Sequence, residues 1–262
     1  MTFLKKSSLS GRGLAGVFIF LLLWEGVIQF LIKFDNLPAP SAIFFSWLDL
    51  LVSKQYWEEI FHTLFAALLG WTIASSLGVF IGIALGLSKT FYKYTYTSIE
   101  VIRPWPGVAF APIGLLLFGF SLQMELVVIV LPALWPVLVN TMGGIRNIPN
   151  SLYEVVSSLR LNKYSRIYKV YLPSAKASIL VGLRISLSLS IIMAVVAEMI
   201  GSPNGMGYAI VREQQAMHPT NMFAYIFTIA LLNVLINYLL NNIINQLTPG
   251  QRKKNTIGAM TT

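Results

Sequence analysis

The sequence predicts an all-α membrane protein, a six-helix transmembrane bundle. Of its 262 residues, 56% are hydrophobic and only 11% are charged, and the mean hydropathy is +0.70. A soluble core of this size cannot bury so much apolar surface. The apolar residues also form continuous runs, whereas the strands of an outer-membrane barrel alternate apolar and polar positions. A helical bundle is therefore favoured over a barrel.

Six apolar runs are long enough to cross a bilayer, because a hydrocarbon core of about 30 Å takes roughly 20 helical residues. The predicted spans lie near residues 13–32, 59–87, 100–119, 124–144, 175–201 and 222–246. Together they form a transmembrane domain at 13–246, flanked by polar tails at 1–12 and 247–262. The first run is predicted to stay as an anchor, since no small-residue cleavage site of a signal peptide follows it.

The basic residues are distributed unevenly over such a bundle. Fourteen of the 19 Lys and Arg residues lie on one side: Lys5, Lys6, Arg12, Lys89, Lys93, Arg146, Arg160, Lys163, Arg166, Lys169, Lys176, Arg252, Lys253 and Lys254. The positive-inside rule makes that side cytoplasmic and places both termini there. The net charge of +9 therefore reports membrane topology, and no nucleic-acid partner is expected.

A basic amphipathic segment at residues 145–173 separates the fourth and fifth spans. Ser151 and Glu154 form a capping box, which predicts that a helix begins here. Four apolar residues then share one helical face: Leu152, Val155, Val156 and Leu159. A short cytoplasmic helix over 151–165 with one apolar face is suited to enter a groove on another protein.

Several kinds of chemistry are excluded or not expected. The sequence has no cysteine, which excludes disulfides and thiolate metal sites. Its two histidines, His62 and His218, are far apart in the sequence, so no metal centre is expected. The glycines of 82–90 lack the Gly-Lys step of a phosphate-binding loop. No cofactor is expected in this chain, and if ATP drives the protein, another chain hydrolyses it.

Polar and helix-breaking residues inside the spans leave two interpretations open. The Glu198 carboxylate is either a structural hydrogen-bonding group or part of a gate. The prolines at 104, 106 and 112 either line a pathway or only kink the third span. The glycines at 78, 82 and 86 favour internal helix packing over a dimer contact. Two local polar pairs are also predicted, Glu25 with Gln29 and Glu100 with Arg103.

Several motifs of the sequence resemble those of a known family. Glu154-Val155-Val156, followed by Leu172-Pro173, resembles the cytoplasmic loop by which ABC importer permeases dock on their ATPase. Further motifs resemble the nitrate/sulfonate/taurine branch of these permeases: Leu37-Pro38-Ala39-Pro40, Arg103-Pro104-Trp105-Pro106 with Pro112 and Phe118-Gly119, Ala197-Glu198-Met199-Ile200, and Gly205-Met206-Gly207-Tyr208. The resemblance covers residues 37 to 250.

The resemblance implies a type I ABC importer permease fold in a bacterial inner membrane. It implies a second permease copy, two ATP-binding subunits that hold ATP and Mg, and an extracytoplasmic substrate-binding protein as partners. It assigns ATPase coupling to Ser151, Leu152, Glu154, Val155, Val156, Leu159, Arg160, Leu172 and Pro173. It assigns the translocation pathway or gate to Arg103, Trp105, Pro106, Pro112, Glu198 and Met199, and an outer loop to Gly205, Gly207 and Tyr208.

The sequence departs from the family pattern at two positions. Arg160 stands where the docking loop usually has glycine, so the turn there is built differently or Arg160 adds a charged contact. Asn221 stands where an acidic residue is expected before the sixth span. The sequence leaves two other functions open. An ion-coupled secondary carrier would use the intramembrane carboxylates Glu25 and Glu198, and an intramembrane enzyme would need an acid or nucleophile pair that the spans lack.

Overall fold

A computed structural model describes residues 11–31, 36–149, 151–152, 158 and 162–247, which are almost entirely helical. The α-helices are α1 Gly11–Gly26, α2 Pro40–Leu50, α3 Lys54–Leu87, α4 Lys89–Ile102, α5 Ala111–Phe118, α6 Leu122–Arg146, α8 Lys163–Arg166, α9 Leu172–Gly201, α10 Gly205–Gln215 and α11 Pro219–Leu247. Three short helical turns of other types join them: η1 Val27–Leu31, η2 Gly107–Phe110 and η3 Ile167–Tyr171.

Four continuous helical stretches are long and apolar enough to cross a membrane: Lys54–Leu87, Leu122–Arg146, Tyr164–Gly201 and Pro219–Ile244. They contain the predicted spans 59–87, 124–144 and 175–201 and overlap 222–246. The first predicted span corresponds to α1 and η1, whose apolar part is shorter than these four. With a bent helix pair counted as one span, the described residues hold up to five candidates, so the six-span count stays a prediction.

The third predicted span, 100–119, is wrong as a single helix. The α4 helix begins at Lys89, where the Ser88 hydroxyl accepts a hydrogen bond from the Phe91 N–H, and it ends at Ile102. The following helical segment, Gly107–Phe118, is bent away from α4 by 86°. The prolines at 104 and 106 lie at this break, and each lacks the backbone N–H that a continued helix would need.

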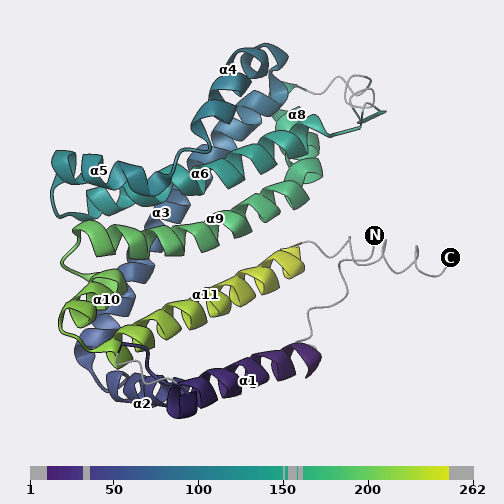
Figure 1. Ribbon diagram of the computed structural model, residues 1–262. Coiled ribbons are helices and arrows are strands. Elements are labelled where there is room, and N and C mark those ends of the chain that lie inside the picture. Colours follow the sequence, from purple (N-terminus) through teal and green to yellow (C-terminus); the bar gives the residue numbers. More distant parts are fainter. Residues whose placement is uncertain (1–10, 32–35, 150, 153–157, 159–161, 248–262) are drawn as a thin grey trace.

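The helix ends gather on two sides of the molecule (Figure 1). On one side lie α2, α10 and the turn between α5 and α6, and we call this the α10 side. On the other lie the end of α6, the start of α9 and the end of α11. Arg146 closes α6, and Arg166, Lys169 and Lys176 lie around the start of α9, so this cluster of basic residues shares one side. That agrees with the predicted charge asymmetry, and a cytoplasmic location for this side remains a prediction.

Glycines on α3 set the packing of α3 against α6. A Cβ atom at Gly70, Gly78, Gly82 or Gly86 would meet Ile129, Val137, Thr141 or Ile145, respectively. Each partner lies 59 positions after its glycine, so the two helices run parallel in a constant register. Because glycine has no side chain, the two helices can approach this closely. The predicted internal packing of the glycines at 78, 82 and 86 is confirmed.

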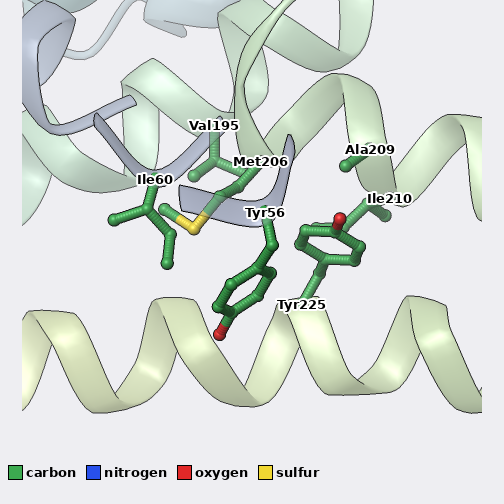
Figure 2. Packing of buried hydrophobic residues seen from close by; sticks show 7 residues of the cluster. All are labelled: Tyr56, Ile60, Val195, Met206, Ala209, Ile210 and Tyr225. Carbon is green, nitrogen blue, oxygen red and sulfur yellow. The ribbon is translucent and has the colours of Figure 1, made fainter. Parts of the chain in front are cut away.

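A buried cluster holds the α10 side of the bundle together, as Figure 2 shows. It consists of Tyr56, Ile60, Val195, Met206, Ala209, Ile210 and Tyr225. These residues come from α3, α9, α10 and α11. The Tyr56 hydroxyl also hydrogen-bonds with the Thr228 hydroxyl at 2.6 Å and accepts from the Trp47 indole N–H at 3.0 Å. The short helices α2 and α10 are thereby anchored on the long spans.

Candidate functional site

The predicted coupling helix lies mostly outside the described residues. Glu154, Val155, Val156, Leu159 and Arg160 belong to the part that the structure does not describe. Ser151 and Leu152 are helical, and Ser151 is exposed. Leu152 is half-buried and packs on a cluster formed by Ile145, Ile148 and Ala175. The segment therefore leaves the end of α6 with one of its apolar residues held against the bundle.

Leu172 and Pro173, at the far end of the same segment, lie where α9 begins. Pro173 follows the π-helical turn Ile167–Tyr171 inside the continuous stretch Tyr164–Gly201, and it has no N–H to donate to the preceding turn. Both residues line an open cavity of about 350 Å³ together with Tyr168 and Lys176. The two ends of the predicted coupling segment thus lie at the same side of the bundle, beside a surface that mixes apolar and basic groups (Figure 1).

The break after α4 brings Arg103 to the middle of α6. The Arg103 side chain lines a groove of about 340 Å³ with Pro132, Trp135, Pro136, Val139, Asn140, Ile185 and Leu189. Its guanidinium lies 3.6 Å from the Glu100 carboxylate, which confirms the predicted pair. Trp105 is exposed and stacks on Phe110 with ring centroids 6.2 Å apart. Pro106 precedes η2, and Pro112 lies in the first turn of α5.

Glu198 is buried, with 1% of its surface exposed, and it stabilises the start of α10. Its Oε2 accepts hydrogen bonds from the Thr63 hydroxyl and from the Gly207 N–H, each at 2.9 Å. The Thr63 oxygen in turn accepts from the Met206 N–H at 2.9 Å. A carboxylate in this position satisfies free donors of the helix N-terminus and interacts favourably with its dipole.

Two glycines allow α10 to come this close. Gly205 has a φ of +91°, in the left-handed region, and a Cβ there would overlap the Glu198 carboxylate. A Cβ at Gly207 would overlap the Val195 carbonyl oxygen. The predicted outer-loop residues Gly205 and Gly207 therefore belong to one structural unit with Glu198, in which a carboxylate of α9 caps α10.

The structure brings two more ionisable groups to Glu198. His62 Nδ1 lies 3.3 Å from Glu198 Oε1, and His62 Nε2 lies 3.9 Å from Glu125 Oε1. Glu125 has 1% of its surface exposed, and its Oε2 has no hydrogen-bond partner among the described residues. We call His62, Glu125 and Glu198 the His–Glu cluster; it joins α3, α6 and α9.

A pocket of about 460 Å³ opens beside this cluster. It is lined by Gln55, Glu58, Glu59, Phe61, His62, Phe65, Pro203, Asn204, Gly205 and Tyr208. The predicted outer-loop residue Tyr208 thus lies at a polar pocket that reaches His62. Met199, which is exposed, does not line it.

A network of charged groups ties α10 to the neighbouring helices. Arg212 donates to Glu59 Oε1 at 2.6 Å and to Glu213 Oε1 at 2.9 Å. Asn221 donates to Glu213 Oε2 at 3.1 Å and accepts from the Ser46 hydroxyl at 2.7 Å. Although burial acts in the opposite direction, hydrogen bonds to Glu59 and Glu213 raise the pKa of Arg212. Burial also opposes the shift at Glu213, where hydrogen bonds from Asn221 and Arg212 lower the pKa.

The His–Glu cluster and the Arg212 network were both missed in the sequence. The distance between the two histidines in the sequence indicates no metal site, whereas in the structure His62 meets carboxylates from two other helices. The available signal was that His62, Glu125 and Glu198 each lie near one end of a predicted span. That signal did not show which helix faces converge.

Comparison with known proteins agrees with this architecture. The sequence pattern of the family described as "Binding-protein-dependent transport system inner membrane component" matches residues 74–253. The putative aliphatic sulfonates transport permease protein SsuC of Bacillus subtilis is 35% identical over 199 residues, covering 76% of this chain and 72% of that protein. The nitrate import permease protein NrtB of Synechococcus elongatus is 32% identical over 202 residues, covering 73% of this chain and 72% of that protein.

The fold is also shared with a solved structure. A chain from the inward-facing conformations of the MetNI methionine ABC transporter superposes with a TM-score of 0.65 at 17% identity, covering 72% of this chain and 94% of that chain. The matched region contains the break after α4, the His–Glu cluster residues of α6 and α9, and the segment before α9. The chain belongs to the binding-protein-dependent transport system inner membrane components, which are permease subunits of ABC importers and not enzymes.

Proposed function

We propose that this chain, paired with a second copy of itself, forms the translocation pathway of an ABC importer for a small anion or polar metabolite of the nitrate, sulfonate and taurine class. A binding protein outside the membrane delivers the substrate, and two ATP-binding subunits in the cytoplasm drive its passage. The sulfonate and nitrate permeases among the relatives support the substrate class. The observation that carries the proposal is the position of Arg103.

Arg103 lies at the depth of a span centre. The groove that it lines is built on Pro132, Trp135 and Pro136, which are central in α6. A guanidinium at this depth is costly in contact with lipid and is normally found facing a bundle interior or a wet cavity. Yet 47% of the Arg103 side chain is exposed in the single subunit. It therefore requires a water-filled path or a second subunit on its open side.

The groove has the polar groups that an anion path needs. The Arg103 guanidinium offers several donors in a planar arrangement that suits carboxylate, sulfonate and nitrate oxygens. Pro132 and Pro136 have no N–H, so the carbonyls one turn earlier lose their helical donors. Only a wet or protein-covered surface satisfies such carbonyls within a membrane. These features support a hydrated groove that faces the subunit partner.

Coupling to ATP is assigned to the helix at 151–165. Its two flanks, at the end of α6 and the start of α9, emerge at one side of the bundle. A partner that pushes on this helix would move α6 and α9 together. Alternating access would then follow from rigid-body movement of the spans.

An ion-coupled secondary carrier is not favoured. Such a carrier needs intramembrane carboxylates that bind and release the coupling ion. Glu25 accepts hydrogen bonds from Gln29 and from the Ser41 hydroxyl, which confirms the predicted Glu25–Gln29 contact. Glu198 Oε2 caps α10, which gives this carboxylate a structural role. The permease relatives favour the ABC importer.

An uptake assay in proteoliposomes tests this function. The proteoliposomes contain the permease, its ATP-binding subunit and its binding protein, and the probes are nitrate, taurine and an alkanesulfonate. Arg103→Gln removes charged hydrogen bonds to the anion, each worth about 1.5 to 3 kcal/mol. We expect ATP-dependent uptake of the transported probe to fall about 10- to 100-fold. Lys93→Gln removes a cation from the first half of α4, the helix that precedes Arg103, and serves as the matched control.

Two results would contradict the proposal. Wild-type uptake by Arg103→Gln would remove the anion path from this groove. Uptake driven by an ion gradient without ATP would favour the secondary carrier.

A further inference from the structure

We propose that the His–Glu cluster is a binding site for one divalent transition-metal cation, with Zn²⁺ as the probe that defines it. The cluster supplies one imidazole nitrogen and two carboxylate oxygens, and these ligand atoms lie within 4.8 Å of one another. One histidine and two carboxylates form a ligand set that suits zinc, manganese or iron. The site is separate from the Arg103 groove, so the proposal does not depend on the substrate pathway.

One ligand pair already has the separation that a bound ion requires, whereas Glu125 Oε1 lies 3.9 Å from Nε2, the other ring nitrogen of His62. Zinc at about 2.1 Å from each ligand requires ligand atoms that are roughly 3.4 Å apart in a tetrahedral site. His62 Nδ1 and Glu198 Oε1 are 3.3 Å apart. Glu125 must move nearer; its Oε2 has no hydrogen-bond partner among the described residues, while the Ser202 hydroxyl hydrogen-bonds to its carboxylate. A buried carboxylate oxygen that lacks a partner is costly, and a cation would satisfy it.

The surroundings of Glu198 orient it as a ligand. Its Oε2 is held by the Thr63 hydroxyl and the Gly207 N–H, which leaves Oε1 to face His62. Metal-binding carboxylates and histidines are normally oriented by such secondary hydrogen bonds. Oε2 is thus fixed in place by α3 and α10, while Oε1 points into the cluster.

The charges of the cluster also favour a divalent cation. Two carboxylates with 1% exposure each face one imidazole, so without a cation one of them must hold a proton or leave a negative charge uncompensated. The Arg212 guanidinium, which also lies on the α10 side, is committed to Glu59 and Glu213. The Ser202 hydroxyl, which hydrogen-bonds to the Glu125 carboxylate, carries no charge. A divalent ion bound by neutral imidazole balances both carboxylates.

The pocket at the α10 side gives the ion a route to the site. His62 lines this pocket, and 28% of its side chain is exposed. Glu58 and Glu59 lie at the same pocket, where each is paired with a cation, Lys54 and Arg212, respectively. A bound ion would connect α3, α6 and α9 next to the start of α10.

Metal binding by the full-length permease in detergent tests the proposal, and the absence of cysteine keeps background binding low. After incubation with Zn²⁺ and gel filtration, elemental analysis should find one zinc per chain. His62→Gln and Glu125→Gln should lose it, while His218→Gln, which changes the other histidine, should retain it. Thr63→Val should weaken binding about 10- to 100-fold, as loss of an orienting hydrogen bond does at metal sites.

A second measurement separates loss of binding from loss of folding. Zn²⁺ should raise the melting temperature of the wild type and of His218→Gln but not that of His62→Gln, with each variant first shown to be monodisperse. Zinc that is bound equally by His62→Gln would overturn the assignment. A wild type that retains no zinc would also overturn it and would leave the cluster as a proton-sharing group.

Discussion

Replacement of Gly205 by alanine tests whether the Glu198 cap holds α10 in place. Gly205 has a φ of +91°, and an L-residue in the left-handed region costs roughly 1 to 2 kcal/mol. The new Cβ would also overlap the Glu198 carboxylate. Moving that carboxylate breaks its bond from the Gly207 N–H, and a hydrogen bond to a charged group is worth about 1.5 to 3 kcal/mol. The expected destabilisation is therefore about 3 to 5 kcal/mol.

Thermal unfolding of the purified permease, followed by tryptophan fluorescence, measures this effect. For a chain of this size, 1 kcal/mol shifts the melting temperature by roughly 2 to 4 °C, so Gly205→Ala should lower it by about 10 °C. Gly143→Ala is the matched control, because a Cβ at this helical glycine meets no atom within 4 Å. That change should be neutral or stabilising by up to about 1 kcal/mol. Equal melting temperatures for the two variants would refute the capping argument.

Three further predictions concern topology, coupling and pH. Ser151→Cys, on the cysteine-free background, should react with a thiol reagent only from the cytoplasmic side and should be protected by the ATP-binding subunit. Val52, near the start of α3, is 89% exposed, and Val52→Cys should react only from outside. The opposite labelling would invert the topology. Glu154→Ala should leave membrane insertion normal but lower substrate-stimulated ATP hydrolysis, because it removes about 1 kcal/mol of helix capping. Glu154→Gln should have a smaller effect. Normal ATP hydrolysis in both variants would show that the helix does not transmit the coupling. Hydrogen bonds outweigh burial and lower the pKa of Glu213 below its ordinary 4.5, so its stabilisation is present above that value and is lost as pH falls through the lower folded value. The melting temperature should therefore drop below about pH 4.5 in the wild type, and Glu213→Gln should show a smaller drop.

The spans were predictable because a membrane helix is encoded locally, as a run of about 20 apolar residues. The start of α10 was not predictable in the same way. Residues 202–219 contain Gly205, Gly207 and Pro203, which are typical of a loop. The helix forms there because its first N–H groups are satisfied by Thr63 and Glu198, which belong to other helices. No local pattern contains that information.

The same limit applies to the break after α4 and to Asn221. The prolines showed where the third span is interrupted, but the 86° bend depends on how Gly107 fits against Pro132 of α6. The sequence alone indicates the loss of an acidic contact at Asn221. In the structure its amide joins Ser46 to Glu213, so a neutral side chain maintains a connection between α2 and α10. The His–Glu cluster was hidden for a similar reason, since its members become neighbours only in the assembled bundle.

The constant register between α3 and α6 limits how the protein can change length during evolution. Successive contacts from Gly78 to Gly86 recur every four residues on both helices, close to the 3.6 residues of a helical turn. A single-residue insertion in either helix would rotate every later contact by about 100° around the helix axis and place a bulky side chain where a glycine is needed. Insertions and deletions should therefore be confined to the ends of this pair. This helix pair therefore keeps the separation between the α10 side and the opposite end of the bundle constant.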